Sequence, residues 1–266
     1  MHHRTFVRMA ALGAAGATAL FAAPAAFAAT GSAAATSAPA QITAIAHHES
    51  HGLHSLSSRS NSSVESSNWS GYAATGSDGE FTTVSASWTQ PTIKCSSKTT
   101  YSSYWVGLDG YSNSALEQTG TEADCIGGKA EYGAWWEVLP ASESDYSVTV
   151  EAGDSLSASV VDNGDGTFTM TLTDSTEGWS KSTTADGSSG YEDSSAEVIA
   201  EATDVNGSIA KLSDFGTMSF TSAEADGTSL GSYSPTEIVM AGNSDIKAQP
   251  GSISGGTFSD VWKNYS

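Results

Sequence analysis

Most of this sequence lacks histidine and arginine. All six histidines and all three arginines lie before residue 60, so the rest of the chain cannot assemble a Ser-His-Asp or Cys-His hydrolase or a His-ligated zinc site. Residues 227–231 (GTSLG) match the nucleophile-elbow pattern. Because no imidazole follows to activate Ser229, we predict a turn there.

Basic residues of any kind are scarce. From residue 68 onward, seven lysines stand against 28 aspartates and glutamates, a formal charge of −21. Such a surface repels nucleic acid phosphates and anionic lipids, so neither nucleic acid nor a membrane is an expected partner. Carboxylates, carboxamides, hydroxyls and the seven lysines remain for catalysis. Of these, carboxylates are the obvious acid/base pair, and their reference pKa of about 4 suits an acidic medium.

Long apolar runs are absent after the N-terminus. Residues 1–8 carry two arginines, residues 9–26 are Ala-rich and apolar, and Ala26-Phe27-Ala28 fits a cleavage site. We therefore expect residues 1–28 to be the signal peptide of a secreted, extracellular protein rather than a membrane anchor.

The next segment is poor in large apolar residues. Residues 29–67 cannot bury a core of their own and are expected to be a pro-segment or linker. Their histidine-rich stretch, residues 47–54 (HHESHGLH), is interpreted as part of this segment rather than as a metal site. Residues 68–266 are enough for one domain.

Cysteine is limited to Cys95 and Cys125. An even pair in a secreted chain predicts a disulfide. Closing a loop of about 31 residues stabilises the fold by about 3 to 4 kcal/mol in the chain-entropy model.

Strand patterns are present and long amphipathic helical patterns are not. Runs that alternate or are β-branched recur between Gly, Asn, Asp and Ser, and they predict an antiparallel sandwich or barrel. The runs are residues 83–91, 146–161, 167–173, 196–202, 217–223 and 236–242. Residues 162–166 (DNGDG) are interpreted as a hairpin turn rather than a calcium loop, since the distal glutamate is missing.

Several blocks resemble the glutamic peptidases, or eqolisins. SNWSGY (67–72) resembles the family's N-W-x-G run, and YWVGLDGYSNSALEQTG (104–120) resembles its W-V-G-I-D-G...L-Q-T-G block. YGAWWEVLP (132–140) resembles A-W-Y-E-W-Y-P, and AEVIAEA (196–202) resembles the strand that carries the family's catalytic glutamate. The blocks follow the family's order along the chain.

The resemblance implies a fold and a site. The fold is an all-β antiparallel β-sandwich of two packed curved sheets, concanavalin-like, with a substrate-binding face, and the activity is acid endopeptidase. Gln118 and Glu201 are the implied dyad. The resemblance also implies positions that line or support the site: Trp69, Trp105, Asp109, Trp135, Glu137 and, where the family usually has Asp, Glu122.

Two departures from the family pattern bear on the site. Leu139 replaces an aromatic residue, so a side-chain preference cannot be transferred from the family. Glu117 precedes Gln118 where an apolar residue is common, but alternation along a strand would place it on the opposite face. The same alternation places Glu197, Ile199 and Glu201 on one face, which we expect to border a polar cleft.

The groups suit peptide hydrolysis. Ionised Glu201 can take a proton from water and pass it to the leaving nitrogen, while the Gln118 amide can donate to the oxyanion. The expected substrate is a polypeptide, the expected state a monomer, and no cofactor or metal is implied. The alternative is a secreted carbohydrate-active sandwich, either a glycosidase with Glu137 and Glu201 across the glycosidic bond or a sugar-binding module.

Overall fold

The computed structural model describes residues 58–60, 63–242 and 245–265. These residues belong to the second of two compact units of the chain, Ala44–Ser266. The expected signal peptide, most of the expected pro-segment and the histidine-rich stretch lie outside the described residues. No helix in the described ranges is both long and apolar enough to cross a membrane.

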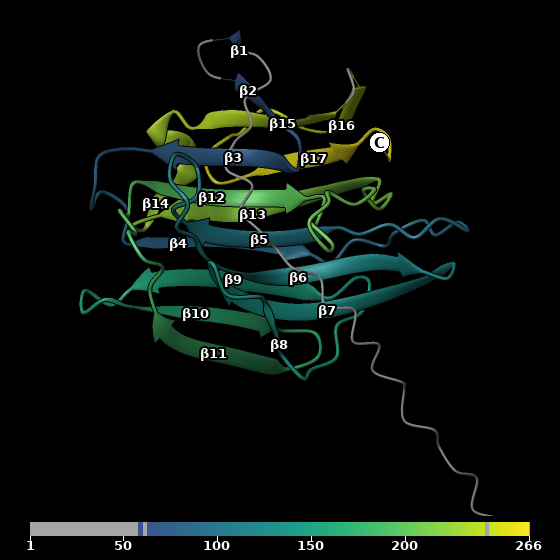
Figure 1. Ribbon diagram of the computed structural model, residues 1–266, viewed down its shortest axis with the longest axis horizontal. Helices are drawn as coiled ribbons and strands as arrows, with labels where there is room; N and C mark the ends of the chain where they lie inside the picture. The colour runs from purple at the N-terminus through teal and green to yellow at the C-terminus, as the bar shows by residue number, and fades with distance from the viewer. Residues whose placement is uncertain (1–57, 61–62, 243–244, 266) are drawn as a thin grey trace, which may run out of the picture. The chain divides into compact units, whose positions relative to one another are not determined.

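Two layers of strands form the described part (Figure 1). The first sheet has the order β7, β6, β5, β12, β3, β15. The bounds of these strands are Lys129–Val138, Glu117–Ile126, Ser103–Leu108, Ser195–Glu201, Trp69–Thr75 and Thr236–Gly242. Short strands β8 (Ser144–Asp145), β2 (Ser63–Ser66) and β1 (Ser58–Ser60) extend it at β7, β15 and β2 respectively.

The second sheet has the order β11, β10, β9, β4, β13, β17, β16. The bounds are Trp179–Asp186, Thr167–Asp174, Ser155–Asp162, Thr83–Thr89, Thr217–Ala225, Phe258–Trp262 and Asp245–Pro250. β14 (Thr228–Ser229) pairs with the end of β13, and a 3-10 helix, η1 (Leu230–Tyr233), follows it. Residues 227–231 are therefore not a strand-to-helix elbow between long elements.

Strand β15 joins the two sheets. Its residues 236–238 pair with β3 of the first sheet, and its residues 240–242 pair with β16 of the second. Apart from the parallel pair β2–β15, the paired strands run antiparallel. The antiparallel β-sandwich expected from the sequence is confirmed.

The main core lies between the sheets. In β10, Phe168, Met170 and Leu172 are fully buried and alternate with half-buried threonines, so one face of the strand packs inward. Tyr104 and Val106 of β5 belong to the same cluster. Burial of each large side chain of this kind contributes about 1.5 to 3 kcal/mol.

Two local expectations differ from the structure. The run 146–161 is a strand only from Ser155, because Glu151 to Asp154 form a tight turn: the Asp154 carboxylate accepts the Glu151 N–H at 2.6 Å, and Gly153 has a φ of 96°. Strands β1 and β2 precede residue 68, the expected start of the domain. They are too short and serine-rich to give an apolar pattern.

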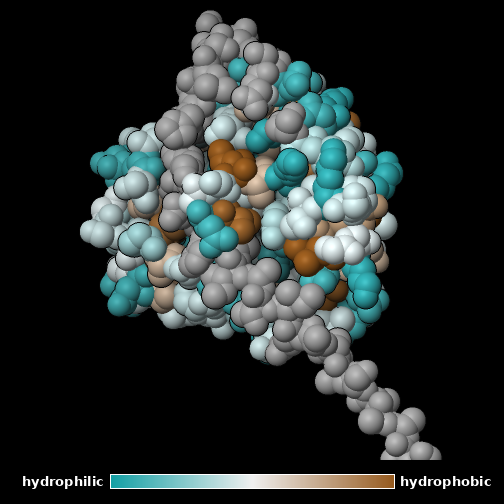
Figure 2. Space-filling view, turned by 45° about the vertical axis from the view of Figure 1, so that its right-hand side comes forward, coloured by the Kyte–Doolittle hydropathy of each residue, from teal (hydrophilic) through white to brown (hydrophobic). Residues whose placement is uncertain are grey.

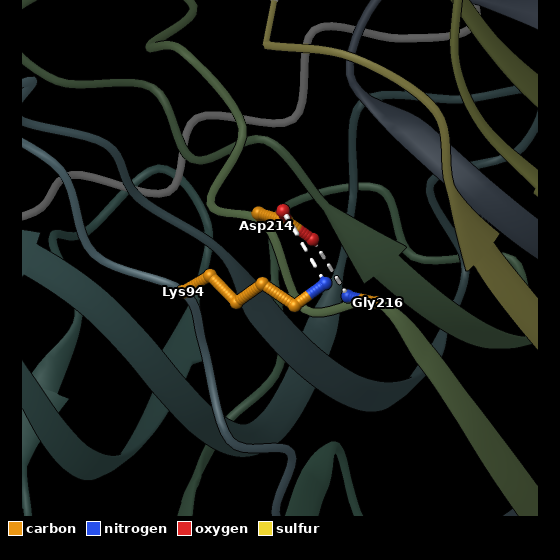
Figure 3. Close-up of polar contacts among 3 residues, drawn as sticks. All are labelled: Lys94, Asp214 and Gly216. Carbon is orange, nitrogen blue, oxygen red and sulfur yellow. Dashed lines mark hydrogen bonds and ion pairs between the residues drawn. The ribbon is translucent and has the colours of Figure 1, made fainter.

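The expected disulfide is confirmed. Cys95 and Cys125 are bonded, with their Cα atoms 5.4 Å apart. Lys94, just before the disulfide, lies 3.8 Å from the Asp214 carboxylate, and the Gly216 N–H donates to the same carboxylate at 3.1 Å (Figure 3). The Lys94 N–H also donates to the Asp214 carbonyl at 2.8 Å, so backbone as well as charge ties this segment to the loop before β13.

Acidic and hydroxyl side chains leave little apolar surface. On the face shown in Figure 2, hydrophilic and intermediate residues cover most of the described area, and hydrophobic side chains occur as small separate patches. The described part of this face therefore shows no single large apolar patch.

Candidate active site

Functional candidates gather on the outer face of the first sheet, the face turned away from the main core. Strand register places their side chains in three rows across β7, β6, β5 and β12. The first row is Glu137, Gln118, Gly107 and Glu197; the second is Trp135, Gly120, Trp105 and Ile199; the third is Gly133, Glu122, Ser103 and Glu201. Trp69 of β3 extends the third row beyond Glu201.

Two glycines make room for Trp105 on this face. A Cβ at Gly107 would lie 2.9 Å from the Trp105 ring and 2.9 Å from Leu116, and a Cβ at Gly120 would lie 2.6 Å from the Trp105 Cβ. A side chain at Gly107 would displace the indole, and one at Gly120 would collide with the β5 backbone at Tyr104 and Trp105. The W-V-G and Q-T-G glycines therefore allow the ring to lie against the sheet, where Trp69 packs on it edge to face with centroids 5.0 Å apart.

Two N–H donors hold the Glu201 carboxylate. Trp105 Nε1 donates to Oε2 at 2.8 Å, and Asn68 Nδ2 donates to Oε1 at 2.9 Å. Glu201 is only 2% exposed. Since both donors are themselves buried, the carboxylate is fixed at the end of β12 rather than free to rotate.

Gln118 is oriented by a second carboxylate. Its Nε2 donates to Glu137 Oε2 at 2.6 Å, between residues that lie directly opposite each other on β6 and β7. A carboxamide has two N–H groups, so one of them is left. Gln118 Oε1 is buried and has no hydrogen-bond partner among the described residues.

The two implied dyad residues are offset along the sheet. Gln118 pairs with Gly107 on β5, and Gly107 pairs with Glu197 on β12. Glu201 lies four residues beyond Glu197 on the same strand. In a flat sheet this offset separates their Cα atoms by about 16 Å, from two strand spacings and four residue rises. Each side chain spans several ångströms, so a substrate group and a water would be needed between their ends.

The other predicted site residues have different surroundings. Trp135 belongs, with Trp69 and Trp105, to a buried apolar cluster on this face. Glu122 is half-buried, and its side chain extends toward β7, since a Cβ at Gly133 would lie 3.0 Å from Glu122 Cγ. Glu137 is fully buried beside Gln118.

Asp109 supports the site by holding the loop that precedes β12. Its carboxylate accepts the backbone N–H groups of residues 192, 193 and 194 at 2.8, 2.9 and 3.0 Å, and Asn113 Nδ2 donates to it at 2.9 Å. This loop leads directly into β12. Asp109 therefore fixes where the strand that carries Glu201 begins.

Two further glutamates are neighbours of the site. Glu117 lies on the opposite face from Gln118, as alternation predicts, and accepts the Ser188 N–H at 2.6 Å; burial raises its pKa to about 7. Glu197 shares a face with Glu201, as predicted, but is fully buried. Burial raises the pKa of Glu197 well above its ordinary value.

Sequence reasoning did not single out Asn68 or Ser103. Asn68 immediately precedes Trp69 and donates to Glu201, and Ser103 lies directly opposite Glu201 on β5. The spacing S-x-W from Ser103 to Trp105 places both on one face of a strand. In a chain so rich in serine, only the register distinguishes this hydroxyl from the others.

Residues 67–259 match the sequence profile of the Peptidase A4 family, and the chain belongs to that family. This confirms the resemblance to the glutamic peptidases and favours a peptidase over the carbohydrate-active alternative.

Two characterised relatives share part of the sequence. Aspergillopepsin-2 of Aspergillus niger is 31% identical over 183 residues, which cover 60% of this chain and 64% of the relative. Scytalidopepsin B of Scytalidium lignicola is 36% identical over 139 residues, 51% of each protein. The chain thus matches less than two thirds of the length of either relative.

Solved structures share the fold. A scytalido-glutamic peptidase bound to a peptide-based transition state analogue has a TM-score of 0.63 and 30% identity, covering 74% of this chain and 98% of the other. The eqolisin SCP-B in complex with the tripeptide Ala-Ile-His has a TM-score of 0.60 and 28% identity at the same coverage. Both are peptidases with peptide-like ligands.

Proposed function

We propose that this protein is a secreted acid endopeptidase that hydrolyses polypeptides with Glu201 as general base and acid and Gln118 as oxyanion donor. The observation that carries the proposal is the arrangement of these two groups on one sheet face. Two N–H donors fix the Glu201 carboxylate, and Glu137 orients the Gln118 amide with one N–H to spare.

The reaction uses only groups of this face. Glu201 takes a proton from water as the water oxygen bonds to the scissile carbonyl carbon. The carbonyl oxygen becomes an oxyanion and accepts the spare N–H of Gln118. Glu201 then passes its proton to the leaving nitrogen as the C–N bond breaks, which returns the carboxylate.

Unpartnered polar atoms support an extended ligand on this face. Gln118 Oε1, Ser103 Oγ and Trp69 Nε1 are buried without a hydrogen-bond partner in the described ranges. Buried polar atoms without partners are costly and uncommon. A polypeptide backbone and its attacking water offer both donors and acceptors to such atoms.

Glu201→Gln tests the proposal. The purified protein and the variant are incubated with acid-denatured protein at about pH 4, near the reference pKa of Glu. We expect the variant to lose at least about 10² to 10⁴-fold in turnover while keeping its fold, since Gln has the shape of Glu and its oxygen still accepts one of the two N–H groups. Glu177→Gln, at an exposed position, is the control. Wild-type turnover by Glu201→Gln would remove Glu201 from the mechanism.

Secretion and processing belong to the same proposal. The charged start, the apolar run and the Ala-x-Ala site support export. N-terminal sequencing of protein recovered from culture medium should find a start at or after residue 29, and an intact Met1 would contradict the proposal.

A further inference from the structure

Ser103 is the hydroxyl nearest in register to Glu201. The two residues are direct partners on the adjacent antiparallel strands β5 and β12, on the same face. Directly opposed side chains have Cβ atoms about 4.5 to 5.5 Å apart. The Ser103 hydroxyl and the Glu201 side chain therefore leave the same face of the sheet next to each other.

The Ser103 hydroxyl has no structural use within the described residues. Ser103 is fully buried, and its Oγ has no hydrogen-bond partner there. Glu122, its neighbour on the other side of the row, extends toward Gly133 instead. Burying a hydroxyl without a partner costs free energy that alanine would not cost, so packing does not explain this side chain.

The preceding serine, Ser102, differs in that its hydroxyl has hydrogen-bond partners. Ser102 Oγ contacts the Tyr104 hydroxyl at 2.8 Å and donates to the Ala123 carbonyl at 2.8 Å. It is equally buried, but its partners are internal. Ser102 is therefore a matched control for a buried serine whose hydroxyl supports the fold.

We propose that Ser103 is a positioning residue that holds the attacking water against Glu201, an inference that rests on the proposed function. Ser103 Oγ accepts one O–H of the water while the Glu201 carboxylate accepts the other. As the water oxygen bonds to the carbonyl carbon, its proton goes to Glu201 and the carbonyl electron pair goes to the oxyanion. Ser103 keeps its own proton throughout.

If the Ser103 hydroxyl supported the fold, its removal would lower the unfolding midpoint and leave kcat unchanged. A hydroxyl that positions the water predicts the opposite. Removing an unpartnered buried hydroxyl should leave the unfolding midpoint unchanged or raise it, because nothing in the fold loses a bond. Losing the orientation of the water should lower kcat with little change in KM, because a bound substrate is still held.

The experiment compares Ser103→Ala, Ser103→Thr, Ser102→Ala and Glu201→Gln by kcat, KM and denaturant unfolding midpoint. For Ser103→Ala we expect kcat to fall about 10 to 100-fold, KM to stay within about threefold and the midpoint not to fall. Ser103→Thr, which keeps the hydroxyl, should recover most of the kcat. Ser102→Ala should lower the midpoint and leave kcat within about twofold.

The outcomes separate the two proposals. If Glu201→Gln is inactive but Ser103→Ala keeps kcat within about twofold of wild type, the positioning role is wrong and the dyad stands. A midpoint for Ser103→Ala that falls as far as that of Ser102→Ala also overturns it. If Glu201→Gln is active, the proposed function fails and this inference fails with it.

Discussion

Glu137 Oε2 accepts a hydrogen bond of 2.6 Å from Gln118 Nε2, and the two residues face each other directly across β7 and β6. A carboxylate can only accept, so it determines which end of the amide turns toward it. The amide nitrogen is thereby directed to one side, and its second N–H is available for a developing negative charge.

Removing this acceptor should weaken catalysis without touching the dyad. In Glu137→Ala the amide can rotate, so we expect kcat to fall about tenfold or more with a smaller change in KM. Glu137→Gln still offers a carbonyl oxygen and should retain more activity than Glu137→Ala. Steady-state kinetics on one peptide substrate checks this order, and equal activities for both variants would contradict an orienting role.

Gln118 itself should be needed as a donor. We expect Gln118→Ala to lower turnover by at least about 10²-fold, as for a lost oxyanion donor. Gln118→Glu should also fail, since an ionised carboxylate repels the oxyanion. The measurement is turnover at pH 5 to 6, about a unit or more above the Glu reference pKa; full activity of Gln118→Glu there would show that no donor is required.

Asp109 should matter for stability more than for chemistry. Asp109→Ala leaves three backbone N–H groups without their acceptor, two of them buried and one partly buried, and we expect it to lower the free energy of unfolding by about 3 kcal/mol or more. Asp109→Asn keeps one oxygen and tolerates the positive φ of 66°, so it should cost less. Denaturant unfolding gives both values. A change below about 1 kcal/mol for Asp109→Ala would mean that the loop is held by other contacts.

Stability should fall as pH rises from mild acid. Burial raises the pKa of Glu117, Asp193 and Asp260 to about 7 in the folded protein. The folded state therefore binds more protons than the unfolded state between about pH 4 and 7, so the cost of ionising these groups is absent below pH 4 and complete above 7. We expect a melting temperature at least about 5 °C lower at pH 8 than at pH 5.

A matched pair of variants tests this source of pH dependence. Asp260→Asn can still accept from Ser70 Oγ, which donates to Asp260 at 3.0 Å, but it cannot ionise. It should reduce the loss of stability between pH 5 and 8, while Asp186→Asn, at an exposed position, should change it little. A melting temperature that rises steadily from pH 4 to 8 in the wild type would refute the prediction.

Strand alternation and family blocks predicted much of this fold. The run that became β10 was recognisable because each threonine on one face alternates with a large apolar residue. Residues 146–154 misled the pattern, because a turn closed by Asp154 and Gly153 interrupts a sequence of strand-forming residues. Turn geometry depends on hydrogen bonds that apolar periodicity does not encode.

The candidate site was predictable by residue type but not by arrangement. Alternation correctly placed Glu197 and Glu201 on one face. It gave no sign that Gln118 lies in the same row across the sheet as Glu197 rather than in the row of Glu201. That relation depends on the register of β5 between them, which long-range pairing sets. The same is true of Ser103, whose importance comes only from being opposite Glu201.

Because β15 pairs with strands of both sheets, backbone hydrogen bonds join the two sheets along one side of the sandwich. Continuous backbone ladders run around that side through β16 and β17. On the opposite side, two side-chain hydrogen bonds connect β11 to the segment that follows β8. Trp179 Nε1 donates to the Thr149 carbonyl at 2.8 Å, and the Tyr146 hydroxyl donates to Thr183 Oγ1 at 3.1 Å. Local separation of the two sheets should begin where these two hydrogen bonds join them. Amide hydrogens of β11 should therefore exchange with solvent before those of β15. On the face that carries Gln118 and Glu201, motion should be largest at β7, the edge strand.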